Sequence, residues 1–231
     1  MDITNNRVAV YIDGLNLYNG SLARSPYKWL DIKKLCAALL PNEKNIVSIS
    51  YFTALVKNAG FKDGLQRERQ NVYLKALAKN CPDIEIIKGQ FIRNKKIMQI
   101  AQVTKCGSCE EEHIYKNSKV CVWRNEEKKT DVNLSVRLIH DAWKNKYDHA
   151  VVITNDTDIM EAIIAVRENC SPHKLAKKVG FIAPTTVGDR HPARSLLINT
   201  DWHKEIKISH LAISQMPDVI VEGHLFKPVE W

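Results

Sequence analysis

The sequence lacks a hydrophobic run long enough to cross a membrane. Its strongly apolar stretches, such as residues 8–12 and 150–154, span only a few residues, whereas a transmembrane helix needs about 20. The first residues, MDITNNRVAV, contain neither the basic stretch nor the long apolar stretch of a secretion signal. We therefore expect a soluble, cytoplasmic protein.

The sequence also lacks any sign of a boundary between domains. No repeat, low-complexity segment or linker rich in Pro, Gly or Ser separates one part of the 231 residues from another. Hydrophobic residues make up 45% of the chain and charged residues 26%, a balance that excludes a mainly disordered chain, a collagen and a coiled coil. We expect one domain over residues 1–231, with residues 212–231 as a C-terminal tail.

Three common catalytic motifs are missing as well. The first predicted strand is not followed by GxGxxG, and neither GxxxxGK[ST] nor GxSxG occurs in the chain. These patterns mark dinucleotide binding, phosphate-binding loops and serine nucleophiles. The sequence therefore gives no support for a site of any of these three kinds.

What the sequence does contain is an excess of positive charge. Its 34 Lys and Arg residues outnumber its 26 Asp and Glu residues and leave a net charge of +8. Residues 88–129 alone hold ten basic and five acidic side chains. A local positive excess suits a polyanionic partner, nucleic acid first, although a solvated surface gives the same signal.

Apolar runs alternate with amphipathic segments along most of the chain. This alternation indicates a parallel sheet with helices on both faces. In residues 130–147, Val132, Val136, Ile139 and Trp143 recur on one face of a 3.6-residue period. We also expect a short helix near Asp201. The predicted strands are 7–12, 45–56, 84–91, 149–154 and 178–183, and the main predicted helices are 31–40, 64–80, 130–147 and 157–168.

Four aspartates are expected at the carboxyl ends of the strands. Asp13 follows the first strand, Asp156 and Asp158 follow the fourth, and Asp131 opens the helix before it. Each could be only a turn residue or a helix cap. Together they point to a hard, oxygen-only site for Mg²⁺ or Mn²⁺, because crowded carboxylates destabilise a fold unless a cation neutralises them.

The spacing of these acids resembles the NYN domain family of PIN-like ribonucleases. Three segments carry the resemblance: YIDGLNLY at 11–18, KTDVNLSV at 129–136 and VVITNDTDIMEAI at 151–163. The resemblance implies a PIN-like, Rossmann-like α/β sheet flanked by helices. It also implies that Asp13, Asp131, Asp156 and Asp158 hold the metal, and that Asn16 orients a water or a backbone phosphate.

The chain departs from the family pattern in several places. Thr154-Asn155 replaces the usual Ser-Gly, and Glu161 stands where proline is frequent. Glu161 lies three residues after Asp158, on the same helix face, where it could join the metal site or remain solvated. The family often has a further acid two turns into the helix, and in this chain that position falls near Arg137. Arg137 could contact a phosphate instead.

A cysteine-containing insertion is expected over residues 92–124, where the alternation breaks. We interpret it as an inserted β-hairpin. Cys106 and Cys109 form a CxxC pair, Cys121 could return on the opposite strand, and His113 is the nearest fourth ligand for Zn²⁺. A zinc-free hairpin with free thiols is the alternative.

Two groups of basic residues are candidates for binding nucleic acid. Stacking aromatic rings beside phosphate-binding cations are typical of proteins that hold single strands, and Trp123 lies among the first group. His191 could act as an acid, although a lone loop histidine is usually incidental. The first group is Lys116, Lys119, Arg124 and Lys129, and the second is Arg190 and Arg194.

These observations predict a Mg²⁺- or Mn²⁺-dependent endoribonuclease that uses a metal-activated water to hydrolyse RNA. An RNA-binding module that has lost activity, and a PIN-like nuclease acting on DNA, remain as alternatives. The sequence leaves the oligomeric state open.

Overall fold

A computed structural model describes residues 6–43, 45–56, 64–99, 119–168, 177–186, 190–220 and 224–229. Within them lies a seven-stranded sheet in the order β4-β3-β2-β1-β5-β6-β7. The strands are parallel except for the β3–β4 pair. Their bounds are β1 Val8–Asp13, β2 Ile46–Ala54, β3 Ile84–Gln99, β4 Lys119–Lys128, β5 His149–Ile153, β6 Lys178–Ala183 and β7 Trp202–Glu205.

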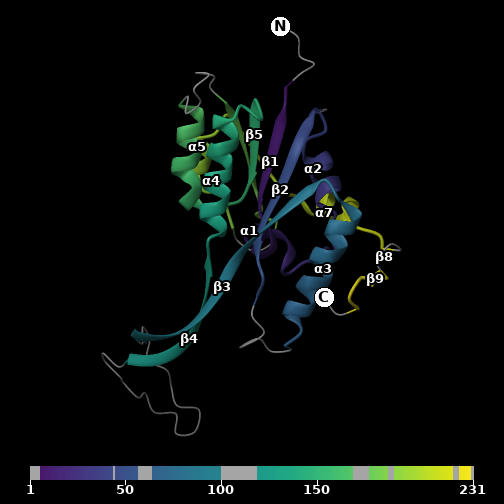
Figure 1. Ribbon diagram of the computed structural model, residues 1–231, viewed down its shortest axis with the longest axis vertical. Coiled ribbons are helices and arrows are strands. Elements are labelled where there is room, and N and C mark those ends of the chain that lie inside the picture. Colours follow the sequence, from purple (N-terminus) through teal and green to yellow (C-terminus); the bar gives the residue numbers. More distant parts are fainter. Residues whose placement is uncertain are drawn as a thin grey trace.

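Helices cover both faces of the sheet (Figure 1). The central strands β1 and β5 are buried along their whole length, as expected for parallel strands covered on both sides. On one face lie α2 (Ile32–Leu39), α3 (Gln66–Asn80) and α7 (Ile208–Ile213), and on the other lie α4 (Thr130–Trp143) and α5 (Met160–Arg167). The shorter elements are α1 Gly14–Leu17, η2 Tyr18–Leu22, η3 Thr157–Ile159, α6 Arg194–Ile198, β8 Val219–Ile220 and β9 Leu225–Phe226.

The fold therefore agrees with the predicted α/β class, with a mostly parallel sheet between helices. The chain runs from β1 outward to β2 and β3, then returns to place β5 on the other side of β1. This reversal of strand order opens a crevice between the carboxyl ends of β1 and β5, where sheets of this kind bind ligands.

A long antiparallel arm, formed by β3 and β4, projects from the same edge of the sheet (Figure 1). Residues 84–89 of β3 pair with β2 in the sheet. Residues 90–99 continue beyond it and pair with β4 from Gln90–Lys128 to Gln99–Lys119. Ten further residues of strand extend the arm by roughly 30 Å. The arm is thus a continuation of the third strand, where we expected a separate hairpin.

Gly89 marks the point at which β3 leaves the body of the sheet. A Cβ atom there would collide with Thr130 Oγ1 and the Lys128 carbonyl oxygen. Glycine is needed because the start of α4 packs directly against the strand. The arm and the first turn of α4 therefore meet at one point.

Two predictions about the helices are wrong. Val132, Val136 and Trp143 of α4 are 63%, 60% and 52% exposed, and the residues buried against the sheet include Leu134 and Leu138. The apolar stripe that periodicity indicated is therefore not the face of α4 that packs against the sheet. The stretch after Asp201 is strand β7 rather than a short helix, because it adds to the edge of β6.

Within the described parts of the chain, no helix combines the length and the apolar character that crossing a membrane requires.

Candidate active site

Asp13 is the last residue of β1 and the N-cap of α1. Its Oδ1 accepts a hydrogen bond from the Asn16 backbone N–H at 2.9 Å. Its Oδ2 accepts one from the Thr154 hydroxyl at 3.0 Å. The carboxylate is 4% exposed, so both oxygens are held in place where the strand turns into the helix.

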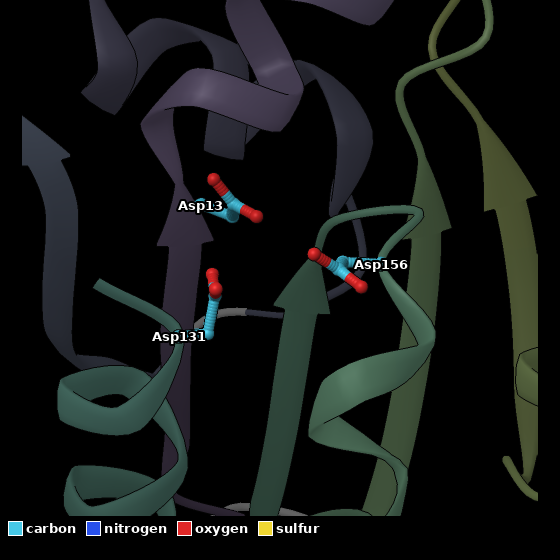
Figure 2. Close-up of side chains that lie close together, drawn as sticks. All are labelled: Asp13, Asp131 and Asp156. Atoms are coloured by element: carbon cyan, nitrogen blue, oxygen red, sulfur yellow. The ribbon is translucent and has the colours of Figure 1, made fainter. Parts of the chain in front are cut away.

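Asp156 lies in the loop that follows β5. The Thr154 hydroxyl accepts a hydrogen bond from the Asp156 backbone N–H at 3.1 Å. Oδ1 of Asp156 accepts one from the Asp158 N–H at 3.0 Å and caps η3. The carboxylate is therefore directed by its own loop toward the end of β1 (Figure 2).

Asp131 comes from the first turn of α4, at the root of the arm. Lys129, the residue before Thr130, adopts a left-handed backbone conformation with φ of 78°. That conformation is uncommon for a side chain other than Gly, Asn or Asp. It turns the chain sharply from β4 into α4 and brings the start of the helix beside the end of β1.

The three carboxylates converge. One oxygen of each of Asp13, Asp131 and Asp156 lies within 4.8 Å of the others, and Figure 2 shows the three side chains facing a common space. Asp13, which lies more than a hundred positions before the other two, thus forms one acidic cluster with them where the strand order reverses between β1 and β5. We call these three residues the acid cluster.

Crowding and burial shift the protonation of the acid cluster. Burial raises the pKa of Asp13 to about 6, with further contributions from the negative charges of Asp131 and Asp156 and an opposing effect of its two hydrogen bonds. Burial and the neighbouring charges of Asp156 and Asp158 also raise the pKa of Asp131. A bound cation would oppose both effects, because it stabilises the ionised carboxylates.

Glu127 is a fourth acid beside the cluster, and the sequence analysis missed it. Burial raises its pKa to about 7, and the charges of Asp13, Asp131 and Asp156 add to the shift. Its Oε1 is buried and makes no hydrogen bond within the described part of the chain. Glu127 is the penultimate residue of β4, so the arm itself brings this carboxyl to the site.

The other predicted acids occupy different positions. Asp158 is exposed in η3 and is not one of the three converging carboxylates. Its charge nevertheless raises the pKa of Asp131, so it lies near the cluster. Glu161 is exposed in the first turn of α5.

Asn16 and Asn155 join three loops at the edge of the site. Oδ1 of Asn16 accepts a hydrogen bond from the Asn155 backbone N–H at 3.1 Å. The Asn155 side chain donates to the His191 carbonyl oxygen at 3.0 Å and accepts from the Ala193 N–H at 2.8 Å. The loop with Arg190 and Arg194, both exposed, is thereby attached beside Asp156.

Arg137 does not offer a free cation to a phosphate. Its guanidinium hydrogen-bonds to Asp141 at 2.9 Å and forms an ion pair with Glu85. Asp141 in turn accepts hydrogen bonds from Lys146 and from the Tyr11 hydroxyl. This network fixes α4 to the sheet and the arm root, which is a structural role.

The arm has two chemically different faces, because neighbouring residues of a strand point to opposite sides. Arg93 and Lys95 flank the Trp123 ring at 4.5 and 5.3 Å from its centroid. Trp123 is 57% exposed. The alternation places Lys119, Cys121 and Glu127 on this same side, which we call the tryptophan face. It runs from the tip of the arm to the acid cluster.

The opposite face of the arm is held by its own ion pairs. Glu126 pairs with Arg124 at 3.1 Å, with Lys128 at 3.2 Å and with Lys96 at 3.6 Å. The predicted nucleic-acid ligand Arg124 therefore shares the single carboxylate of Glu126 with Lys96 and Lys128, and it points away from Trp123.

Three of the four predicted zinc ligands, Cys106, Cys109 and His113, lie outside the described residues. The predicted nucleic-acid ligand Lys116 also lies outside them. Cys121 is described, and its thiol is free and exposed in β4. The zinc site therefore stays a prediction.

Known proteins resemble this chain at both the sequence and the structural level. The 6-hydroxy-3-succinoylpyridine 3-monooxygenase HspA of Pseudomonas putida is 31% identical over an alignment of 243 positions, gaps included, which covers 97% of this chain and 75% of that protein. A solved structure of a Vibrio parahaemolyticus protein of unknown function matches 90% of this chain and 97% of its own, with 14% identity and a TM-score of 0.48.

The family comparison covers strands β1 to β5 of the sheet and the acid cluster. The NYN domain matches residues 7–171, a range that contains all three converging aspartates, the arm and the helices on one face of the sheet. The chain is therefore a member of the NYN domain family, which indicates a nuclease-like function.

Proposed function

We propose that the protein is a Mg²⁺- or Mn²⁺-dependent endoribonuclease. The observation that carries the proposal is the convergence of Asp13, Asp131 and Asp156, with one oxygen of each within 4.8 Å of the others. Family membership supports it, because the NYN domain indicates nuclease-like chemistry.

The acid cluster fits a hard divalent cation. Its ligand atoms are all carboxylate oxygens, which Mg²⁺ and Mn²⁺ prefer over nitrogen or sulfur. Glu127 adds a buried oxygen without a hydrogen bond in the described structure. Burial raises the pKa of Asp13 and of Glu127 and neighbouring negative charges add to the shifts, and a bound cation would favour the ionised form of both carboxyls.

Each part of the chain then has a task in phosphodiester hydrolysis. When bound, the divalent ion supplies an activated water and stabilises the charge that develops on the phosphate. Asp13, Asp131 and Asp156 hold the ion, and Thr154 orients two of them. Arg190 and Arg194, attached beside Asp156 through Asn155, are placed to bind phosphates of the substrate strand.

The tryptophan face supports a single-stranded nucleic acid as the substrate. Trp123 offers a stacking surface, and Arg93 and Lys95 beside it offer positive charge. Single strands are held by such alternation of aromatic and basic groups. Because this face leads to Glu127 at the acid cluster, a strand lying along it would pass over the site.

The name of the Pseudomonas relative describes a different reaction, the oxygenation of a substituted pyridine. For this chain we favour hydrolysis, since the described site is a group of clustered carboxylates beside basic surfaces. That set of ligands suits a redox-inactive cation and a phosphate substrate.

Incubation with labelled RNA tests the proposal. We expect internal cleavage with Mg²⁺ or Mn²⁺ and none with EDTA. The same assay with single- and double-stranded DNA of matching sequence should give much slower cleavage. RNA binding without cleavage under any divalent condition would favour the binding-module alternative, and faster cleavage of DNA would favour a DNA nuclease.

A further inference from the structure

The root of the arm carries two buried oxygen atoms that make no hydrogen bond within the described residues, Glu127 Oε1 and Thr130 Oγ1. Thr130 is 1% exposed, and its hydroxyl lies against Gly89, where the absence of a Cβ atom makes room for it. The same hydroxyl is close enough to Glu127 to lower the pKa of that carboxyl. Buried polar atoms normally have a partner, so these neighbouring oxygens indicate a bound species that is not part of the chain.

Glu127 also differs from its neighbour Glu126 in its counter-charges. Glu126, on the opposite face of the arm, lies within ion-pair distance of three cations. No Lys or Arg of the described chain lies within that distance of Glu127. Arg93 shares the tryptophan face with Glu127, but its guanidinium lies over the Trp123 ring at 4.5 Å from the centroid. The arm therefore leaves the charge of Glu127 to be balanced from the side of the acid cluster.

The turn between β4 and α4 places Glu127 beside the acid cluster. Lys129, with φ of 78°, directs the chain from the strand into the helix, so Glu127 and Asp131 lie on the two sides of one turn (Figure 1). The negative charges of Asp13, Asp131 and Asp156 all act on the Glu127 carboxyl. Glu127 is nevertheless not among the carboxylates whose oxygens converge within 4.8 Å. Its carboxyl thus lies next to the three ligands without joining them.

A carboxylate in such a position can interact with a divalent ion through water. Mg²⁺ usually keeps several water molecules besides its protein ligands, and these waters donate hydrogen bonds to acceptors around the site. Acceptors in this outer layer orient the ligands, and their loss typically weakens metal binding by about 10- to 100-fold. Glu127 Oε1 is a free acceptor of this kind.

We propose that Glu127 is a positioning residue for the divalent ion, which it contacts through the water around the ion, and that the bound ion thereby fastens the arm to the body of the protein. The inference rests on the proposed divalent site at the acid cluster, but it does not depend on cleavage. Glu127 and Trp123 lie on the same face of the same strand. The ion therefore fixes the direction in which the tryptophan face leaves the acid cluster.

Titration of the full chain with Mn²⁺, followed by electron paramagnetic resonance, tests the inference. Glu127→Gln keeps the length of the side chain and removes its charge, and it should weaken Mn²⁺ binding by about tenfold or more. Glu126→Gln makes the same change on the opposite face of the arm and should alter the affinity little. If circular dichroism shows that Glu127→Gln does not fold, Glu127→Asp replaces it. The shorter side chain withdraws the carboxyl and should also weaken binding.

Hydrogen exchange of the arm gives a second readout, which is independent of activity. In the wild type, Mn²⁺ should slow amide exchange in residues 90–92 and 125–128 relative to EDTA, because the ion holds the root of the arm. Glu127→Gln should lose this protection even when its ion site is saturated, whereas Glu126→Gln should retain it. In EDTA, both variants should melt close to the wild type, which separates weakened ion binding from weakened folding.

Either of two results would overturn the inference: Mn²⁺ affinity that is the same in Glu127→Gln and the wild type, or exchange of the wild-type arm that does not respond to Mn²⁺. If the wild type also binds Mn²⁺ and cleaves RNA in these cases, the proposed nuclease stands and only the role of Glu127 fails. A wild type that binds no Mn²⁺ would overturn the ion site itself, and the inference with it. The two failures are therefore distinguishable.

Discussion

The Thr154 hydroxyl joins Asp13 and Asp156: it donates to Asp13 Oδ2 at 3.0 Å and accepts from the Asp156 N–H at 3.1 Å. A single buried oxygen thus sets the relative position of two carboxylates from different strands. Thr154→Val keeps the shape and removes both bonds. We expect a loss of about 1–3 kcal/mol in the free energy of unfolding and weaker Mn²⁺ binding. Denaturant titration and Mn²⁺ titration measure the two effects, and Thr154→Ser should restore both.

Replacing Asp156 by Asn tests the chemistry of the acid cluster. Asparagine still caps η3 through its side-chain oxygen, but one negative charge is lost. We expect cleavage to fall by orders of magnitude and RNA affinity to persist or increase. Asp158→Asn is the comparison, because Asp158 lies outside the three converging carboxylates, and its effect should be much smaller. Equal loss in both variants would extend the ion site to Asp158, and full activity of Asp156→Asn would refute its assignment.

The pKa of Asp13 makes stability depend on pH. Because the pKa of Asp13 is about 6 in the folded state and is ordinarily 3.8, the folded state binds more protons between these pH values. Stability from this group therefore falls as pH rises from about 4 to about 6, by on the order of 2 kcal/mol. In thermal melts in EDTA, the stability of Asp13→Asn relative to that of the wild type should therefore increase as pH rises over this range. A difference in stability between the two proteins that stays constant with pH would contradict the raised pKa of Asp13. Saturating Mn²⁺ should stabilise the wild type more than the variant.

The two faces of the arm should differ in RNA binding. Arg93→Gln with Lys95→Gln removes two charges from the tryptophan face, and Lys96→Gln with Arg124→Gln removes the same two residue types from the opposite face. In a plot of log affinity against log salt, the first pair should reduce the slope by about 1.4, since each single-strand phosphate contact contributes about 0.7. The second pair should change the slope little. The reverse ranking, measured by fluorescence anisotropy, would place the strand on the Glu126 side.

Metal analysis tests the predicted zinc site. If Cys106, Cys109, His113 and Cys121 bind Zn²⁺, the purified protein should contain about one zinc per chain. Cys121→Ser should lower that content, whereas Cys36→Ser, which alters a buried thiol in α2, should not. A folded sample free of zinc would exclude the site.

The sequence predicted β1, β2, β5, β6 and the first part of β3 well, because each of these is a short apolar run. Asp13 and Asp156 could be placed on one edge by the geometry of parallel strands alone. Asp131 was grouped with them on a weaker signal, since an acid in the first turn of a helix is common for other reasons, and the resemblance to the NYN domain family strengthened its assignment. Periodicity identified α4 but selected the wrong face. Leu134 and Leu138 repeat with the same spacing as Val132 and Val136, and only the position of the sheet decides between the two stripes.

Glu127 shows what lay beyond sequence reasoning. It belongs to no motif, and its place depends on how the arm returns to the sheet through Lys129. A partial signal was present: Glu127 lies four residues before Asp131, at the end of a strand that leads directly into the helix. The β3–β4 arm was anticipated as an insertion because its polar alternation differs from the buried strands. Its continuity with β3 depends on pairing with both β2 and β4.

The position of β5 beside β1 has a consequence for synthesis of the protein. Asp13 lies at the end of β1, which is synthesised early. The neighbouring strand β5, which leads to Asp156, is synthesised only after residue 148. A nascent chain that has emerged only as far as α4 contains Asp13 and Asp131 and lacks Asp156. The complete set of three ligands therefore arises only after residue 156 has left the ribosome, and a prematurely terminated product that ends before β5 contains only two of them.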